Sequence, residues 1–278
     1  MQEQFAIDNG TIAYEVTGEG PLVVLAHGIG DSRYAYRFMA PALVAAGYRV
    51  ANIDLRGCGE SSLGWDSYSR TAIASDLVAL VHHLGGPAVI IGHSISGGAA
   101  TISAATAPDN IAGLIELAPF TRAQSISIGA LLHSTRYRKG TACLAKTVFM
   151  GSLTGLRGYL ELAYPTKPHD WESESTRMDA KLCEPGRMRV LQAMGRSSPS
   201  DAGALLAQVR CPVLVIEGSA DPDWPDPGTE GERIIEALPD GLGELVVLEG
   251  IGHYPHVEAP GQVLQVVLPF LARVSSRE

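Results

Sequence analysis

Residues 89–98 read Val89-Ile90-Ile91-Gly92-His93-Ser94-Ile95-Ser96-Gly97-Gly98, and this stretch decides the fold. Its apolar, β-branched beginning predicts a buried strand, and the Ala-rich sequence after it predicts a helix. Ser94 therefore stands at a sharp turn, where backbone N–H groups at the helix N-terminus stabilise negative charge. The small residues Gly92 and Ser96 allow strand and helix to approach closely. A serine in this position is a candidate nucleophile.

The motif departs from the usual Gly-x-Ser-x-Gly, because Ser96 stands where the second glycine is expected. Serine is still small enough to keep the turn. Taken alone, the stretch could also be a glycine-rich turn with a bystander serine. A nucleophilic serine needs a base to accept its proton and an acid to orient that base.

Candidates for both partners lie downstream, each after an apolar run. The first run is followed by Gly218-Ser219-Ala220-Asp221-Pro222-Asp223-Trp224-Pro225. The second is followed by Gly250-Ile251-Gly252-His253-Tyr254-Pro255-His256. Each loop thus begins just past the C-terminal end of a predicted strand. The chain order is Ser, Asp, His, as in the α/β-hydrolase arrangement.

The sequence resembles the α/β-hydrolase fold family over nearly its whole length. His27-Gly28-Ile29-Gly30 stands where the family places its oxyanion loop, and Gly92-His93-Ser94 is similar to its Gly-His-Ser elbow. Asp54-Leu55-Arg56-Gly57-Cys58-Gly59-Glu60-Ser61 resembles its Asp-x-Arg-Gly-x-Gly-x-Ser turn, and residues 252–260 resemble its histidine loop. The resemblance implies an α/β fold with a mostly parallel, eight-stranded sheet flanked by helices.

The resemblance also implies a catalytic triad, with Ser94 as the nucleophile, His253 as the base and Asp221 as the orienting acid. Because His253 must be neutral to act as a base, activity is expected to rise with pH through an apparent pKa near neutrality.

The oxyanion hole implied by the family would consist of the backbone N–H groups of Ile29 and Ile95. His27 is expected to brace the oxyanion loop rather than act as a base. Gly28 and Gly92 support the site by allowing close approach of the backbone.

Three other residues compete for the roles of base and acid. His256 lies close to His253, which is favoured because it directly follows a glycine at the end of a strand, as the family's base does. Asp223 lies two residues after Asp221, the position favoured by the family's Gly-x-x-Asp-x-x-x-Pro pattern. Asp54 is an alternative acid, but its motif resembles a structural turn.

Composition excludes several classes of function. The chain has 278 residues, 46% of them hydrophobic, and a formal net charge of −9 without a basic run, which argues against nucleic-acid binding. The N-terminal residues lack the pattern of a signal peptide. No apolar run reaches the roughly 18 residues of a membrane span. We therefore expect a cytoplasmic protein with a small-molecule acyl substrate and no membrane partner; the oligomeric state is not predicted.

Strand and helix patterns alternate through most of the chain. Strands are predicted at 22–26, 49–53 and 111–117, and a helix at 34–46. The alternation stops after residue 120, where helical stretches near 126–132, 142–150, 155–163 and 188–194 replace it. We predict an α/β-hydrolase core at 1–120 and 209–278 and an inserted helical cap at 121–208.

The cap is expected to lie over the C-terminal ends of the strands, to supply no triad member and to make few buried contacts with the core. Its large apolar residues would line a substrate pocket or form the cap's own core; they are Tyr159, Tyr164, Trp171, Met150, Leu131 and Leu132.

The expected function is hydrolysis of a carboxylic ester, thioester or lactone through an acyl-enzyme. A C–C bond hydrolase or a perhydrolase would use the same residues. A ligand-binding or receptor protein on the same scaffold is the alternative from another class. Serine at the elbow disfavours epoxide hydrolases and haloalkane dehalogenases of this fold, which use aspartate there. We expect no cofactor and no metal, because the sequence has neither a Gly-rich phosphate loop nor a cluster with metal-ligand spacing.

Overall fold

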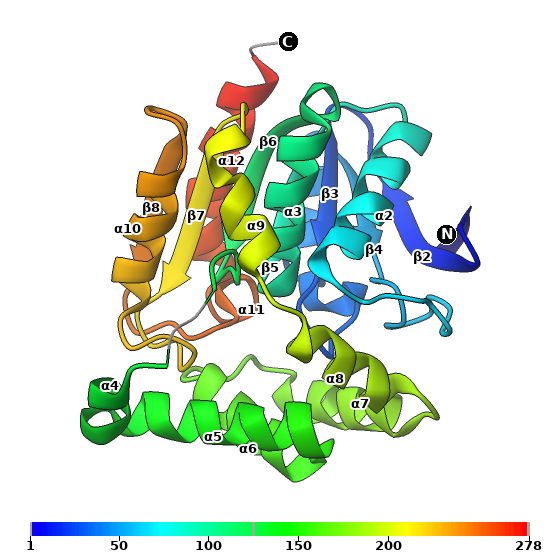
Figure 1. The fold of residues 1–278 in the computed structure, drawn as a ribbon. Helices are drawn as coiled ribbons and strands as arrows, with labels where there is room; N and C mark the ends of the chain where they lie inside the picture. Colours follow the sequence, from blue (N-terminus) through cyan, green and yellow to red (C-terminus); the bar gives the residue numbers. More distant parts are fainter. Residues whose placement is uncertain (1, 124–125, 277–278) are drawn as a thin grey trace.

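The computed structural model describes residues 2–123 and 126–276, and one sheet runs through the centre of this part (Figure 1). Its eight strands are β1 (Gln2–Ile7), β2 (Gly10–Thr17), β3 (Leu22–Ala26), β4 (Arg49–Ile53), β5 (Ala88–His93), β6 (Ile111–Leu117), β7 (Val213–Gly218) and β8 (Gly243–Leu248). Their order across the sheet is β1-β2-β4-β3-β5-β6-β7-β8. Strand β2 pairs antiparallel with β1 and β4, and all other pairs are parallel. The prediction of a mostly parallel, eight-stranded sheet is confirmed.

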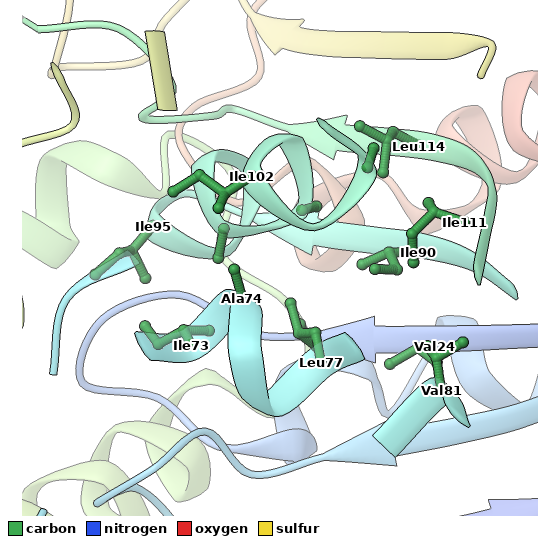
Figure 2. Close-up of a cluster of buried hydrophobic side chains, with 14 of the residues drawn as sticks. Val24, Ile73, Ala74, Leu77, Val81, Ile90, Ile95, Ile102, Ile111 and Leu114 are labelled. Carbon is green, nitrogen blue, oxygen red and sulfur yellow. The ribbon is translucent and has the colours of Figure 1, made fainter. Parts of the chain in front are cut away.

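The central strands are apolar on both faces because helices cover both sides of the sheet. In β3, Val24 and Ala26 belong to one buried cluster, whereas Val23 and Leu25 belong to another on the opposite face. This period of two follows from the alternating directions of side chains along a strand. Figure 2 shows part of the first cluster, where Val24 lies near Val81 of the covering helix α2 (Arg70–His83).

Each face of the sheet has its own set of helices. Besides α2, the first cluster includes residues of α3 (Ile95–Thr106), α9 (Ser200–Leu205) and α10 (Pro227–Ala237). The second includes residues of the 3₁₀ helix η1 (Arg33–Tyr36), α1 (Met39–Ala45) and α12 (Pro260–Ser275). Shorter turns complete the core: η2 (Pro108–Asn110), η3 (Leu206–Gln208) and α11 (Pro255–Glu258).

The helix expected at 34–46 is two separate helices, η1 and α1. Pro41 explains the difference, because a proline fits the first turn of a helix but breaks a hydrogen bond in its interior. The second helix therefore begins at Met39, which leaves Pro41 in its first turn.

Five helices follow β6 and gather at the end of the sheet to which β7 points (Figure 1). They are α4 (Ile128–His133), α5 (Thr135–Met150), α6 (Leu153–Ala163), α7 (Trp171–Cys183) and α8 (Arg187–Arg196). We call this group the helical insertion. Helix α7 was not predicted, because its sequence is rich in charged and polar residues and buries few apolar side chains.

The helical insertion is joined to the core by partly buried polar contacts and by one buried apolar cluster. Arg37 of the core forms an ion pair with Asp170, with Nε 2.6 Å from Oδ2. Arg187 donates to the carbonyl oxygens of Gly57 and Ser61, both at 2.9 Å. A buried apolar cluster also joins α6 and α7 to the loop after β8. These contacts form between distant segments and leave no local pattern in the sequence.

None of the helices in residues 2–123 and 126–276 has both the length and the hydrophobicity needed to cross a membrane.

Candidate active site

Ser94 lies at the turn between β5 and α3 in a strained backbone conformation, with φ 55° and ψ −116°. Non-glycine residues seldom adopt a positive φ, and such strain persists only where the surrounding structure enforces it. A Cβ atom on Gly92 would lie 2.4 Å from the carbonyl oxygen of Ser96, so this position requires glycine. The sharp turn predicted from the sequence is present, and Ser94 is 5% exposed.

Ser96, the residue that departs from the usual motif, links α3 to the loop after β3. Its Oγ donates a hydrogen bond to the carbonyl oxygen of His27 at 2.6 Å. A Cβ atom on Gly28 would lie 3.2 Å from Cβ of Ser94. The loop with the proposed oxyanion donor Ile29 therefore passes directly beside the serine, and Ser96 fixes it there.

His27 braces the same loop from the inside. The backbone N–H of Leu55 donates to its Nε2 at 3.1 Å, so Nδ1 carries the hydrogen and donates to the carbonyl oxygen of Gly28 at 2.7 Å. Burial lowers the pKa of His27 to about 4, which keeps the ring neutral. The side chain thus has the bracing position expected for it.

His253 follows β8 and pairs with Asp221, which follows β7. His253 Nδ1 lies 2.7 Å from Oδ2 of Asp221, and both side chains are buried. Burial alone would lower the pKa of His253, but the charges of Asp221 and Asp223 and the hydrogen bond to Asp221 outweigh it and raise the pKa to about 9. This value is higher than the near-neutral one expected from the sequence, because two carboxyl groups lie beside the ring.

Asp223 is the second of these carboxyl groups. Its Oδ2 lies 3.4 Å from Nδ1 of His253 and accepts a hydrogen bond from the Tyr159 hydroxyl at 2.9 Å. Its backbone N–H donates to Oδ1 of Asp221 at 2.8 Å. Burial raises the pKa of Asp223 to about 7, against the opposing effects of His253 and Tyr159. The structure therefore places Asp221 closer to His253 and directs Asp223 toward the helical insertion as well.

The competing candidates Asp54 and His256 are positioned differently. The carboxylate of Asp54 accepts hydrogen bonds from the backbone N–H groups of Arg33 at 2.7 Å and Glu60 at 2.9 Å, so it holds a turn together. The ring of His256 is fully buried and stacks on Tyr36 at 4.9 Å, and burial lowers its pKa to about 3.

A cavity of about 240 Å³ lies between the core and the helical insertion, and Ser94 and His253 both line it. The remaining lining residues are Ile29, Arg70, His93, Phe120, Leu144, Thr147, Leu156, Tyr159, Leu191, Gly195, Ser197, Pro199, Asp223 and Tyr254. A larger and more open groove of about 1000 Å³ lies elsewhere, beside Arg33 and Arg177, and contains none of these residues.

Of the six apolar residues proposed for the pocket, only Tyr159 lines this cavity. Tyr164 stacks on Tyr254 and belongs to a buried cluster against which Trp171 packs. Met150 is 76% exposed and Leu132 is 71% exposed. Leu131 lies outside the cavity lining too. A helix presents several apolar residues, and the sequence alone does not show which of its faces meets the core.

The cavity also contains a residue that sequence reasoning missed, Arg70 at the start of α2. A single arginine at the beginning of an amphipathic helix resembles any surface residue, so no local signal could have identified it.

The side chains of Asp221, Asp223 and His253 are, among the described residues, a group that could hold a metal ion, with ligand atoms within 4.8 Å of one another. Sequence spacing did not predict this grouping, because it brings together two different loops. A hydrogen bond already joins two of its members, His253 and Asp221.

Comparison with known proteins gives a family match and several relatives. The model of the alpha/beta hydrolase family matches residues 23–266. Bifunctional epoxide hydrolase 2 of Sus scrofa is 41% identical over 83 residues, which are 29% of this chain and 15% of that protein. The RutD protein of Variovorax paradoxus, whose name assigns it provisionally as a carbamate hydrolase, is 28% identical over 275 residues, or 95% of this chain and 97% of that protein.

Solved structures show the same fold. A thermophilic esterase from Thermogutta terrifontis has a TM-score of 0.72 and 27% identity, covering 99% of both chains. The esterase EaEST from Exiguobacterium antarcticum has a TM-score of 0.81 at 20% identity, covering 98% of this chain and all of that one. The family match over most of its length, with the full-length relatives from Variovorax paradoxus and Thermogutta terrifontis, establishes that the chain is an enzyme of the alpha/beta hydrolase family.

Proposed function

We propose that the protein is a cofactor-independent serine hydrolase that cleaves a carboxylic ester, thioester or lactone. The observation that carries this proposal is the convergence on one cavity of a strained serine, a His–Asp pair and a glycine-rich loop beside the serine. Nucleophilic acyl transfer requires these components at one point.

In the proposed reaction, Ser94 Oγ attacks the carbonyl carbon while its proton passes to Nε2 of His253. Asp221 accepts the hydrogen bond from Nδ1 and stabilises the imidazolium that forms. The backbone N–H groups of Ile29 and Ile95 would bind the oxyanion of the tetrahedral intermediate. When the intermediate collapses, the bond to the leaving group breaks and His253 gives its proton to that group. Water, activated by His253 in turn, then hydrolyses the acyl-enzyme.

The relatives differ in the chemistry that their names state, and the elbow residue helps to choose among them. Epoxide hydrolases of this fold use aspartate at the elbow, whereas this chain has Ser94. The Thermogutta terrifontis structure is an esterase with 27% identity over nearly the whole chain. Both observations favour ester hydrolysis over epoxide opening.

We further propose that residues 121–208, which include the helical insertion, act as a cap that controls access to Ser94. The support is the composition of the cavity lining, to which α5, α6 and α8 contribute apolar side chains. Burial of a substrate by such a layer excludes water and restricts which acyl groups fit.

The test is pre-steady-state hydrolysis of 4-nitrophenyl acetate, with intact-protein mass spectrometry. We expect a burst of nitrophenol, a covalent acyl adduct and labelling by a small fluorophosphonate. Ser94→Ala should fold normally, lose the adduct and lose turnover by roughly three to six powers of ten. Substantial turnover by purified Ser94→Ala would refute the assignment, and absence of turnover and labelling in the natural protein would favour a ligand-binding role.

A further inference from the structure

Arg70 is a buried cation in the cavity that contains Ser94 and His253. The residue is 3% exposed and lines the cavity from the first position of α2. A buried charge is costly unless a counter-charge and hydrogen bonds compensate it. The contacts of Arg70 therefore show whether the protein itself supplies the counter-charge and the hydrogen bonds that a buried guanidinium requires.

All hydrogen-bond partners of Arg70 in the described part of the chain are neutral. Its Nε donates to the carbonyl oxygen of Phe120 at 2.9 Å. Its Nη1 donates to the carbonyl oxygen and the Oγ of Ser197, at 3.0 and 2.9 Å. Within residues 2–123 and 126–276, Nη2 donates to no protein group, and no carboxylate oxygen lies within 4.0 Å of the guanidinium.

Arg56 shows what a complete pairing looks like in the same protein. It is similarly buried, at 5% exposure, and forms a two-pronged pair with Asp76, with Nε–Oδ2 at 2.7 Å and Nη2–Oδ1 at 2.6 Å. Arg70 lacks such a partner. The difference between the two arginines is the missing carboxylate, and only Arg70 faces the cavity.

The cavity around Arg70 combines its positive charge with apolar walls, and the carboxyl group of Asp223 also lines it. Burial lowers its pKa to about 10, partly offset by the charge of Asp201, so the guanidinium remains positive at neutral pH. Six apolar side chains line the same cavity: Ile29, Phe120, Leu144, Leu156, Leu191 and Pro199. In such a setting a charge interacts more strongly than in water, and the two N–H groups of Nη2, which the protein leaves free within the described residues, can donate charge-assisted hydrogen bonds to a carboxylate.

The geometry points to Arg70 as a specificity residue that binds a free carboxylate of the substrate while Ser94 attacks the ester. The preferred substrates would then be esters that carry a second, ionised carboxyl group. This inference rests on the proposed serine hydrolase function. A purely structural role would instead confine Arg70 to joining Phe120 and Ser197, the segments that enter and leave the helical insertion.

The experiment compares substrates that differ only in the carboxylate. One pair is 4-nitrophenyl hydrogen glutarate and 4-nitrophenyl pentanoate, which places the charge on the acyl part. The other is 3-carboxy-4-nitrophenyl butyrate and 4-nitrophenyl butyrate, which places it on the leaving group. We expect the natural protein to prefer the charged ester of one pair by roughly ten- to a hundredfold in kcat/KM. Which pair shows the preference identifies the part of the substrate that Arg70 binds.

Arg70→Met should abolish this preference, so that kcat/KM falls roughly ten- to a hundredfold more for the charged ester than for its neutral partner. Arg70→Lys should keep part of it, because lysine retains the charge but not the planar guanidinium. Arg196→Met removes a positive charge from an exposed position in α8 and serves as the matched control. Equal losses for charged and neutral esters in Arg70→Met would show a structural role and overturn the inference.

A measurement on the natural protein covers the case in which Arg70 variants fail to fold. Glutarate should protect Ser94 from the fluorophosphonate at lower concentration than glutaramide, which has the same length and no charge. Equal protection by both compounds, or equal rates for both members of each substrate pair, would overturn the inference. Failure of the proposed function looks different, since neither nitrophenyl ester turnover nor labelling would then occur.

Discussion

The core and the helical insertion contribute to the site in different ways. In the core, short-range geometry places the groups: Ser94 is held by the strained turn after β5, and His253 and Asp221 follow two parallel strands. The insertion contributes through a long side chain that extends to the core, since the Tyr159 hydroxyl donates a hydrogen bond to Asp223 at 2.9 Å. Backbone geometry therefore places the proposed reacting groups, while side chains of the insertion adjust their surroundings.

The insertion also supports the backbone of both loops that carry the proposed acid and base. The N–H of His253 donates to the carbonyl oxygen of Ala163, at the end of α6, at 2.9 Å. Arg136 of α5 donates to the carbonyl oxygen of Ser219 at 3.1 Å and also to that of Asp221. The contacts therefore do not divide the molecule into a reacting core and a passive cover. Substitutions can show how much the insertion contributes to activity.

Asp221 and Asp223 give the largest expected difference in activity, because both lie in the loop after β7 but, within the described residues, only Asp223 accepts a hydrogen bond from the insertion through its side chain. Asp221→Asn should lower kcat/KM by roughly two to four powers of ten, because it removes the group that fixes the tautomer of His253. Asp223→Asn should cost about tenfold or less, because its carboxylate is farther from Nδ1, at 3.4 Å against 2.7 Å. Steady-state kinetics on 4-nitrophenyl butyrate at the pH of maximal activity, with circular dichroism to verify folding, makes the comparison. A larger loss in Asp223→Asn would transfer the role of acid to that residue.

The pH profile tests how strongly the two carboxyl groups act together on His253. A raised pKa means that the protonated ring is favoured, and the base must be neutral, so activity is lost as pH falls. With the pKa at about 9, kcat/KM should rise through pH 9 and at pH 7 be about one-hundredth of its plateau value. Asp223→Asn removes one of the charges that raise this pKa and should move the rise to lower pH. A midpoint near pH 7 in the natural protein would show that the carboxyl groups affect the ring only weakly.

The sequence predicted the strands of the core better than the helices and contacts of the insertion. Strands β3, β4 and β6 have the predicted bounds, because buried apolar runs flanked by polar or turn residues carry their own signal. Asp221 and His253, which the structure joins by a hydrogen bond, were predicted from loop motifs at strand ends together with the family resemblance. Helix α7 and the position of Arg70 were missed, since each depends on partners distant in sequence. The same holds for the link between Tyr159 and Asp223, which joins residues 64 positions apart.

The smallest expected effect belongs to Tyr159→Phe, which removes one hydroxyl and keeps the ring. The hydroxyl stabilises the ionised form of Asp223, so its loss should favour protonation of that carboxyl group. His253 then loses part of a nearby negative charge, its pKa falls, and the rise in kcat/KM moves to lower pH. The shift should have the direction of that in Asp223→Asn but be smaller, and kcat/KM at the plateau should change less than about tenfold.

Tyr164→Phe is the matched control for this last comparison, because Tyr164 ends the same helix and stacks on Tyr254 with ring centroids 4.3 Å apart. It should leave the pH profile unchanged. If Tyr159→Phe gives the same profile as Tyr164→Phe and the natural protein, the insertion does not influence His253 through Asp223. The contribution of α6 to the site would then be limited to the shape of the cavity and to the backbone contact between Ala163 and His253.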